Sequence, residues 1–234
     1  MSISVENLTK FYGTQQVINN ISFEAQQGVL GFLGPNGAGK STTMKILTGY
    51  LPQTSGTVSV CGLSSETFSL EIKKKIGYLP ENNPLYNDMY VKEFLDFVAD
   101  LHKISNKKER IQEVIATTGL TPEQNKKIGD LSKGYKQRVG IAQAIIHDPE
   151  VLILDEPTSG LDPNQLIEVR SLIKELGKTK TVILSTHIMQ EVEAICQRVV
   201  IINKGQIVAN DNIENLLIAH NESSIEPIFV KLTN

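Results

Sequence analysis

The chain has 234 residues, and its 23 lysines and arginines against 26 aspartates and glutamates give a formal net charge of −3. Hydrophobic residues make up 40% and charged residues 21%, a globular composition that excludes bulk disorder. The apolar runs are short, whereas a membrane-spanning helix needs about 20 apolar residues, so no span is expected. The slightly acidic balance argues against a dedicated nucleic-acid binder.

The first third of the chain predicts short strands around one helix. Alternating apolar and polar residues between positions 3 and 23 indicate antiparallel strands. Residues 29–33 form a compact apolar strand before a glycine-rich turn, and a helical pattern follows through residues 44–47. Further strands are expected at residues 57–60 and 76–79.

From residue 82 the apolar residues follow helical spacing, and residues 82–148 predict an all-helical insert. Asn106 and Glu109 have the spacing of a capping box at the start of one helix. The pair Thr121-Pro122 is typical of another helix start.

Strand character returns in the last third of the chain. Short apolar runs predict strands at residues 151–154, 181–184 and 199–202. Amphipathic helical patterns lie between these runs, which indicates a parallel sheet covered on both faces. Residues 203–208 suggest a hairpin end and residues 213–219 a helix, and Ile228–Leu232 is strand-like.

Residues 34–41, Gly-Pro-Asn-Gly-Ala-Gly-Lys-Ser, fit the phosphate-loop pattern G-x-x-x-x-G-K-[ST]. Glycines allow backbone N–H groups to converge on phosphate oxygens where a side chain would collide. We expect Lys40 to reach the β- and γ-phosphates of a nucleotide and the Ser41 hydroxyl to bind magnesium. The predicted nucleotide-binding residues of this loop are Gly34, Pro35, Asn36, Gly37, Ala38, Gly39, Lys40, Ser41 and Thr42.

The apolar strand at residues 151–154 ends in two acids, Asp155 and Glu156. Acids at the end of a buried strand lie where ligands bind in open parallel sheets. A magnesium–nucleotide site needs a carboxylate near the metal and a group that orients or deprotonates water. We assign Asp155 the first role and Glu156 the second; the alternative is an acidic surface turn. His187 follows another predicted strand at the same sheet edge.

These motifs occur in the order found in the nucleotide-binding subunits of ATP-binding cassette (ABC) transporters, and the chain resembles that family over most of its length. Residues 131–138, Leu-Ser-Lys-Gly-Tyr-Lys-Gln-Arg, resemble the family's signature motif. Residues 159–162, Ser-Gly-Leu-Asp, resemble its dimer-contact loop. His187 matches the switch histidine, which would bind the γ-phosphate and hold the attacking water, and Tyr12 matches the aromatic residue that stacks on adenine.

The resemblance implies a role for each matching residue. The implied catalytic residues are Glu156, His187 and Lys40. The implied metal ligands are Ser41, Asp155 and Glu81. The implied dimer contacts are Ser132, Gly134 and Asp162, and Ser132 and Gly134 would also bind the nucleotide.

The chain departs from the commonest family pattern at two places. In the signature, whose usual form is Leu-Ser-Gly-Gly-Gln, Lys133 and Tyr135 replace Gly and Gln. Glu81 stands where the family usually has glutamine, and an ionised glutamate accepts a metal bond but donates no hydrogen bond. These variants resemble the exporter branch that pairs with a separate six-helix permease. Within that branch, residues 78–90 are most similar to the gliding-motility subgroup.

The fold that the resemblance implies is α/β: a P-loop NTPase with a RecA-like parallel-sheet core, an N-terminal antiparallel β subdomain and a helical insert. Residues 1–81 and 149–234 would form the nucleotide-binding core, and residues 82–148 the helical subdomain that carries the signature.

The implied function is ATP hydrolysis that powers export through a separate transmembrane permease. The cofactors would be ATP and Mg²⁺. Two subunits, identical or homologous, would close head to tail over two ATP molecules, each between the phosphate loop of one subunit and the signature helix of the other. The implied location is the cytoplasmic face of the inner membrane, and no nucleic-acid partner is expected.

Two other functional classes stay open at this point. An ABC protein acting on DNA or ribosomes usually carries long coiled coils or two cassettes in tandem. A regulatory module would bind ATP without turning it over, and Glu81 and the altered signature keep that alternative open. Because exporter ATPases of this branch often continue further, we hypothesise that the natural protein is longer.

Overall fold

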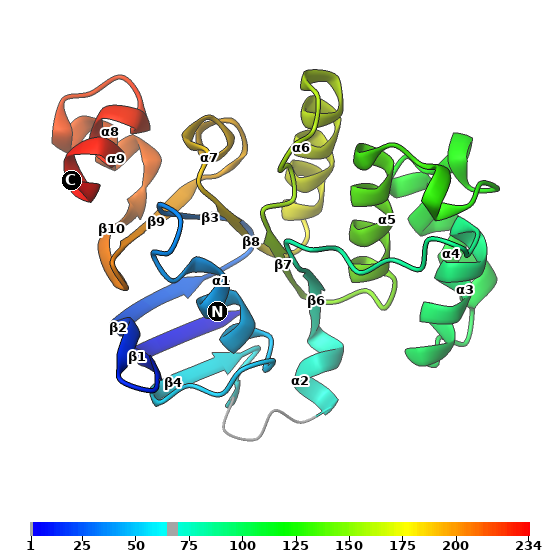
Figure 1. The fold of residues 1–234 in the computed structure, drawn as a ribbon, viewed down its shortest axis with the longest axis horizontal. Helices are drawn as coiled ribbons and strands as arrows, with labels where there is room; N and C mark the ends of the chain where they lie inside the picture. The colour runs from blue at the N-terminus through cyan, green and yellow to red at the C-terminus, as the bar shows by residue number, and fades with distance from the viewer. Residues whose placement is uncertain (1, 65–69) are drawn as a thin grey trace.

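A computed structural model describes residues 2–64 and 70–234 of the chain. Two β-sheets meet in the middle of the molecule (Figure 1). A group of helices lies on the side coloured green, and a smaller helical pair near the C-terminus lies on the opposite side. The arrangement confirms the predicted mixed α/β fold with an N-terminal antiparallel sheet.

The first sheet is antiparallel. Its strands are β1 (Ile3–Tyr12), β2 (Gln15–Ala25), β4 (Ser55–Val60) and β5 (Leu63–Ser64). Within the described residues their order across the sheet is β2-β1-β4-β5. Alternate residues of β1 and β2 are buried, which explains the apolar–polar alternation of the sequence.

The second sheet carries the parallel core. Its strands are β3 (Gly28–Leu33), β6 (Ile76–Leu79), β7 (Val151–Asp155), β8 (Thr181–Thr186), β9 (Arg198–Asn203) and β10 (Gln206–Asn212). Their order in the described part of the chain is β10-β9-β3-β8-β7-β6, and only β10 runs antiparallel to its neighbour. Because β3, β8 and β7 are adjacent and parallel, their carboxyl ends meet at one edge of the sheet.

Helices cover both faces of the parallel core. Helix α1 (Lys40–Leu47) lies between the two sheets, while α6 (Pro163–Gly177) and α7 (Met189–Ile195) lie on the other face (Figure 1). In β7, Ile153 packs in the cluster with α1, whereas Leu152 packs with the helices of the opposite face. Burial on both faces explains the unbroken apolar run of this strand.

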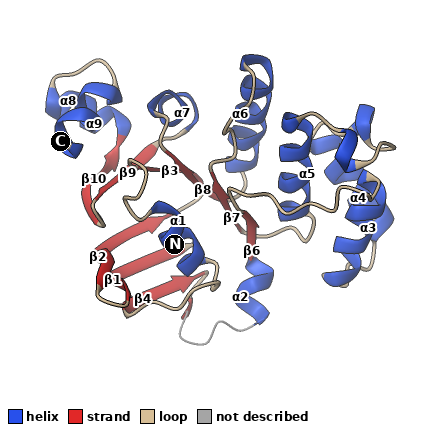
Figure 2. Ribbon diagram, in the orientation of Figure 1, coloured by secondary structure: helices blue, strands red, loops and turns tan. Residues whose placement is uncertain are grey.

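The chain between residues 82 and 148 consists of helices and the loops that join them (Figure 2). After the short helix α2 (Leu70–Lys75), its elements are α3 (Val91–Leu101), α4 (Lys107–Thr117), the 3₁₀ turns η2 (Thr121–Glu123) and η3 (Ile128–Asp130), and α5 (Lys133–Ile145). The capping box predicted at Asn106 does not form, because the Asn106 side chain makes no cap hydrogen bond. The helix start predicted at Thr121 opens only the single turn η2.

The C-terminal segment forms α8 (Ile213–His220) and α9 (Ile225–Thr233). The strand expected at Ile228–Leu232 is therefore wrong. The apolar residues Ile225, Ile228, Phe229 and Leu232 recur at helical spacing and pack in one cluster, and this spacing favours a helix over a strand. None of the helices in residues 2–64 and 70–234 combines the length and apolar character that crossing a bilayer requires.

Two stacked histidines join the helical part to the parallel core. The rings of His102, after α3, and His147, after α5, are parallel with centroids 4.0 Å apart. Nε2 of His147 lies 3.1 Å from the carbonyl oxygen of Ile76, the first residue of β6. Burial, together with the neighbouring His102, lowers the pKa of His147 to about 4. The folded protein therefore holds His147 neutral at pH values where the unfolded chain protonates it.

We expect the free energy of unfolding to fall by up to about 3 kcal/mol as the pH drops from the ordinary histidine range through 4. The sign follows because the unfolded chain binds the proton in that window and the folded protein does not. His147→Phe should lose part of this pH dependence while keeping the stacked ring. Denaturant unfolding of the wild type and the variant at several pH values measures this dependence. If the free energy of unfolding changed with pH equally in both proteins, His147 would not be its source.

Candidate functional site

The phosphate loop joins strand β3 to helix α1. Gly39, the N-cap of α1, has a φ angle of 107°, in the left-handed region that favours glycine. A Cβ atom at Gly34 would lie 2.5 Å from the carbonyl oxygen of Ile202, so the backbone packs too closely there for any side chain. These glycines shape a tight turn that leads into the N-terminus of a helix, where anions bind.

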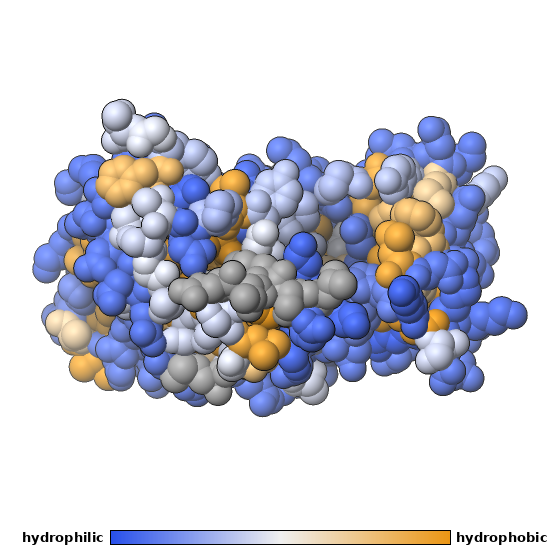
Figure 3. All heavy atoms as spheres, turned by 90° about the horizontal axis from the view of Figure 1, so that it is seen from below, coloured by the Kyte–Doolittle hydropathy of each residue, from blue (hydrophilic) through white to orange (hydrophobic). Residues whose placement is uncertain are grey.

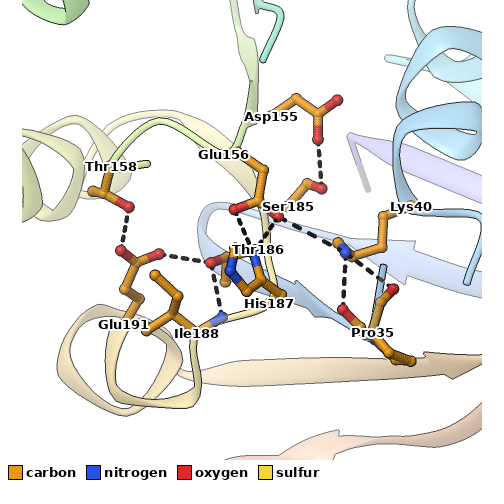
Figure 4. A network of polar contacts seen from close by, with 11 residues as sticks. Pro35, Lys40, Asp155, Glu156, Thr158, Ser185, Thr186, His187, Ile188 and Glu191 are labelled. Carbon is orange, nitrogen blue, oxygen red and sulfur yellow. Dashed lines mark hydrogen bonds and ion pairs between the residues drawn. The ribbon is translucent and has the colours of Figure 1, made fainter. Parts of the chain in front are cut away.

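Lys40, the first residue of α1, is buried in this turn. Its Nζ donates hydrogen bonds to the carbonyl oxygens of Gly34 at 2.8 Å and Pro35 at 3.3 Å. The same atom lies 3.8 Å from Oε1 of Glu156 (Figure 4). Burial lowers the pKa of Lys40, and the neighbouring carboxylates, Glu156 first, oppose that shift. A positive group thus lies between the phosphate loop and the acidic strand end.

The two acids after β7 have different surroundings. Asp155 is buried, and its Oδ1 accepts a hydrogen bond of 2.7 Å from Ser185 Oγ on the adjacent strand β8. Glu156 has a φ angle of 52°, which is uncommon for a residue other than glycine, and its N–H donates to the carbonyl oxygen of Ser185 at 2.9 Å. Strained backbone of this kind concentrates at functional sites.

His187 contacts Glu156 directly. Its Nδ1 lies 2.9 Å from Oε1 and 3.0 Å from Oε2 of that carboxylate (Figure 4). Burial raises the pKa of Glu156, while the hydrogen bond from His187 opposes the rise. An ionised Glu156 can only accept this bond, so Nδ1 carries the hydrogen. The histidine predicted to face a γ-phosphate is therefore held beside the predicted water-activating carboxylate.

A cavity of about 320 Å³ opens over the phosphate loop and Glu156. Its lining residues are Val17, Asn36, Gly37, Gly39, Lys40, Ser41, Thr42, Glu81 and Glu156. A neighbouring cavity of about 490 Å³ adds Asp155 and shares Ser41 and Glu81. The parallel sheet thus brings the phosphate loop, the acidic strand end and Glu81 together around one hollow.

The donors around Ser41 fit a magnesium ion. Ser41 supplies a hydroxyl, and Asp155 and Glu81 supply carboxylates, which are the hard oxygen ligands that Mg²⁺ prefers. The hydrogen bond from Ser185 leaves the second oxygen of Asp155 available to a metal. Glu81 is exposed, and its charge acts on Lys40.

Tyr12 lies at the end of β1, paired with Gln15 of β2, and the residue is 46% exposed. The Nζ of Lys10 lies 5.3 Å from the ring centroid, a cation–π distance. The ring has a free surface on which a base can stack, but it does not line either of the two cavities described above.

The predicted signature residues lie at the N-terminus of α5. Ser132 is the N-cap, and its Oγ accepts a hydrogen bond from the N–H of Tyr135 at 3.4 Å. Gln165 Nε2 donates to the same Oγ at 3.3 Å, and a Cβ atom at Gly134 would lie 2.6 Å from Gln165 Cδ. Neither Ser132 nor Gly134 lines the two cavities at the phosphate loop. Within the described part of one chain, Ser132 and Gly134 therefore lie apart from the residues that line those two cavities.

Asp162, the predicted dimer contact, is the N-cap of α6. Its Oδ1 accepts a hydrogen bond of 3.0 Å from the N–H of Gln165. The side chain is exposed. Within one chain Asp162 therefore shapes the turn that carries Gln165 to Ser132.

A family model described as ABC transporter matches residues 18–159, more than half of the chain. The matched segment contains the phosphate loop, the signature region and the acidic strand end. The chain belongs to the ABC transporter family. It is an ATP-binding subunit, and ATP hydrolysis is the general activity of that family.

Relatives and solved structures agree with this assignment to the ABC family. The bacitracin transport ATP-binding protein BcrA of Bacillus licheniformis is 41% identical over 208 residues, 88% of this chain and 68% of the relative. The structure of an ATP binding subunit of an ABC transporter superposes with a TM-score of 0.89 at 27% identity, covering all of both chains. The dimeric structure of MJ0796, a bacterial ABC transporter cassette, gives a TM-score of 0.80 at 24% identity and covers 90% of this chain and 98% of the other.

The sequence motifs did not identify some residues of this ABC site. Ser185 and Thr186 end the apolar strand β8 as buried polar residues, and that pattern alone could have marked them. Glu191 is fully buried beneath the site, yet in the sequence it resembles any acid in the first turn of a helix. Gln165 reaches Ser132 across 33 positions, and no local pattern indicates such a contact.

Proposed function

We propose that this ABC subunit binds ATP with magnesium over the phosphate loop and hydrolyses it with Glu156 as the general base. The observation that supports this most strongly is the convergence of Lys40, Glu156 and His187 at the adjoining ends of β3, β7 and β8, with contacts of 3.8 Å and 2.9 Å. Lys40 would pair with the phosphates, and His187 would orient Glu156 and bind the γ-phosphate when the site is filled. The loop residues named above would bind the nucleotide, and Tyr12 would stack on the adenine.

We propose that Ser41, Asp155 and Glu81 hold the magnesium ion. When bound, the ion neutralises charge on the phosphate oxygens and orients them. Because Glu81 adds a negative charge where the commonest family pattern has glutamine, this chain would hold the ion with one carboxylate more than that pattern supplies.

We further propose that two subunits pair head to tail, so that Ser132 and Gly134 of each complete the phosphate site of the other and Asp162 lies in the contact. The dimeric form of the MJ0796 cassette supports the pairing of two subunits. The hydrogen bonds of Ser132 support its proposed contact with a phosphate. In both of them Oγ is the acceptor, so the hydroxyl hydrogen is available to a phosphate oxygen.

Ser132→Ala tests this pairing. The single subunit should bind ATP with the affinity of the wild type, because the phosphate loop is intact, whereas hydrolysis should fall about tenfold or more because a donor to the γ-phosphate is lost. Calorimetry and a steady-state ATPase assay measure the two quantities. Equal loss in both, or unchanged turnover, would count against a site shared between subunits.

We propose that residues 1–81 and 149–234 act as the nucleotide-binding core and residues 82–148 as the helical part that contacts a separate permease. Figure 3 shows hydrophobic side chains at the surface on the side of α3. Two exposed aromatic residues of the helical part are Tyr86 and Phe97. The Tyr86 ring meets the Phe97 ring edge to face, with centroids 6.0 Å apart. The subunit would then lie on the cytoplasmic face of the inner membrane, held there by the permease.

The proposed transport role is drug export. BcrA is named for bacitracin transport, and this name favours a drug substrate over the gliding-motility function suggested by residues 78–90. Purification of the native membrane complex, followed by mass spectrometry of its partner, tests the role. A permease whose deletion raises sensitivity to bacitracin supports it, and purification without any membrane protein opposes it.

A further inference from the structure

A fully buried carboxylate lies beneath the site. Glu191, on α7, has no exposed surface. Its Oε1 accepts a hydrogen bond from the hydroxyl of Thr158, and its Oε2 accepts one of 2.7 Å from the hydroxyl of Thr186 (Figure 4). Both threonines are themselves buried.

The charge on Glu191 fixes the direction of these bonds. A carboxylate only accepts, so each threonine must point its hydrogen at Glu191. The oxygen of Thr186 is then free to accept, and it takes a hydrogen bond of 3.1 Å from the N–H of Ile188. Arg170 of α6 brings an opposite charge to 3.8 Å from Oε1. The Nε of Arg170 is buried and has no hydrogen-bond partner among the described residues. The carboxylate of Glu191 is therefore the common acceptor for the hydroxyl groups of Thr158 and Thr186.

The two threonines belong to the two loops that carry the predicted catalytic residues. Thr158 lies two positions after Glu156, and Thr186 lies immediately before His187. The carboxylate of Glu191 thus bridges the segment after β7 and the end of β8. The Glu156–His187 contact spans the same two segments.

We propose that Glu191 is a positioning residue that holds Glu156 and His187 at their mutual distance during turnover. The proposal rests on the proposed roles of Glu156 and His187. Glu191 acts through Thr158 and Thr186 and touches neither reacting residue. With the bridge in place, movement of one loop is transmitted to the other, so the base and its histidine partner move together.

Anchoring α7 does not require this residue. Val192 and Ile195 of the same helix are already packed in the hydrophobic core. Burying a carboxylate costs desolvation energy, and apolar replacements of buried charged groups are often neutral or stabilising. A charged group retained here among hydroxyl donors of two catalytic loops therefore favours positioning over packing.

Glu191→Gln and Thr158→Val test the proposal, because each keeps the shape of the side chain. We expect kcat to fall about tenfold in each, since small misplacement of a base is costly, while KM for ATP and the ATP affinity stay unchanged. The double variant should fall no further than the lower single variant, because both changes remove the same bridge. Glu193→Gln is the matched control on α7 and should leave kcat unchanged. Its carboxylate accepts a hydrogen bond from the N–H of Ile225, away from the site.

The outcome that would overturn the proposal is a kcat per folded molecule equal to that of the wild type in both variants, with only the thermal stability lowered. A parallel measurement on Glu156→Gln separates this from failure of the proposed function. If Glu156→Gln stays active, the assigned base is wrong; if it is inactive while Glu191→Gln turns over normally, only the role of Glu191 is wrong.

Discussion

Glu156→Gln should lower ATP turnover about a thousandfold, because removal of a general base typically costs two to four orders of magnitude. ATP affinity should stay within about twofold of the wild type, since the amide keeps the size of the carboxylate and Lys40 keeps its carbonyl partners. The variant should accumulate as an ATP-bound dimer. Size-exclusion chromatography with ATP and a single-turnover assay measure these effects.

The pH dependence of the wild type gives an independent check on the same residue. Burial raises the pKa of Glu156 above the ordinary range of a glutamate. A general base works only when deprotonated, so turnover should rise with pH through the raised pKa and level off above it. Glu156→Gln should lack that rising limb. Undiminished turnover in this variant, or an unchanged pH profile, would refute the role of Glu156.

Lys40→Met should weaken ATP binding about a hundredfold, which corresponds to the loss of charge-assisted hydrogen bonds to phosphate oxygens. The rate of ATP hydrolysis at limiting ATP should fall by at least the same factor as the affinity. Isothermal titration calorimetry measures the affinity, and an affinity equal to that of the wild type would contradict the assignment.

The stability of Lys40→Met without nucleotide distinguishes a lost contact from a damaged fold. Lys40 is buried and its pKa is lowered by that burial, so the folded protein bears a cost for the charged amine. Methionine fills a similar volume without that cost. The melting temperature of the variant should therefore equal or exceed that of the wild type, and a lower one would show that Lys40 also supports the fold.

Much of the candidate site could be predicted from the sequence because it follows simple strand patterns. An apolar run such as residues 151–154 is buried on both faces, and in a parallel sheet the residues after such runs share one edge. Asp155, Glu156 and His187 each follow a strand of this kind, so their meeting was expected. The glycine pattern of the phosphate loop also predicts phosphate binding without reference to the strands.

Other parts of the molecule depend on packing that a local pattern does not encode. The helix at Ile225–Thr233 resembles a strand over five residues and is recognised only when Ile225 is included in the spacing. Glu191 and Gln165 each bond a partner 33 positions away, and neither residue type is unusual on a helix. The direct contact between His187 and Glu156 also depends on the left-handed turn at Glu156, which the sequence does not indicate.

In the proposed pairing, two chains share each ATP site, with Lys40 from one chain and Ser132 from the other. Mixing Lys40→Met with Ser132→Ala tests it most directly, because a mixed dimer would contain one site with both residues intact. Each variant alone should hydrolyse ATP at about a tenth of the wild-type rate or less, and the equimolar mixture should recover up to about a quarter of the wild-type rate, because half of the dimers contain one intact site. A mixture no more active than its components would contradict a site shared between two chains.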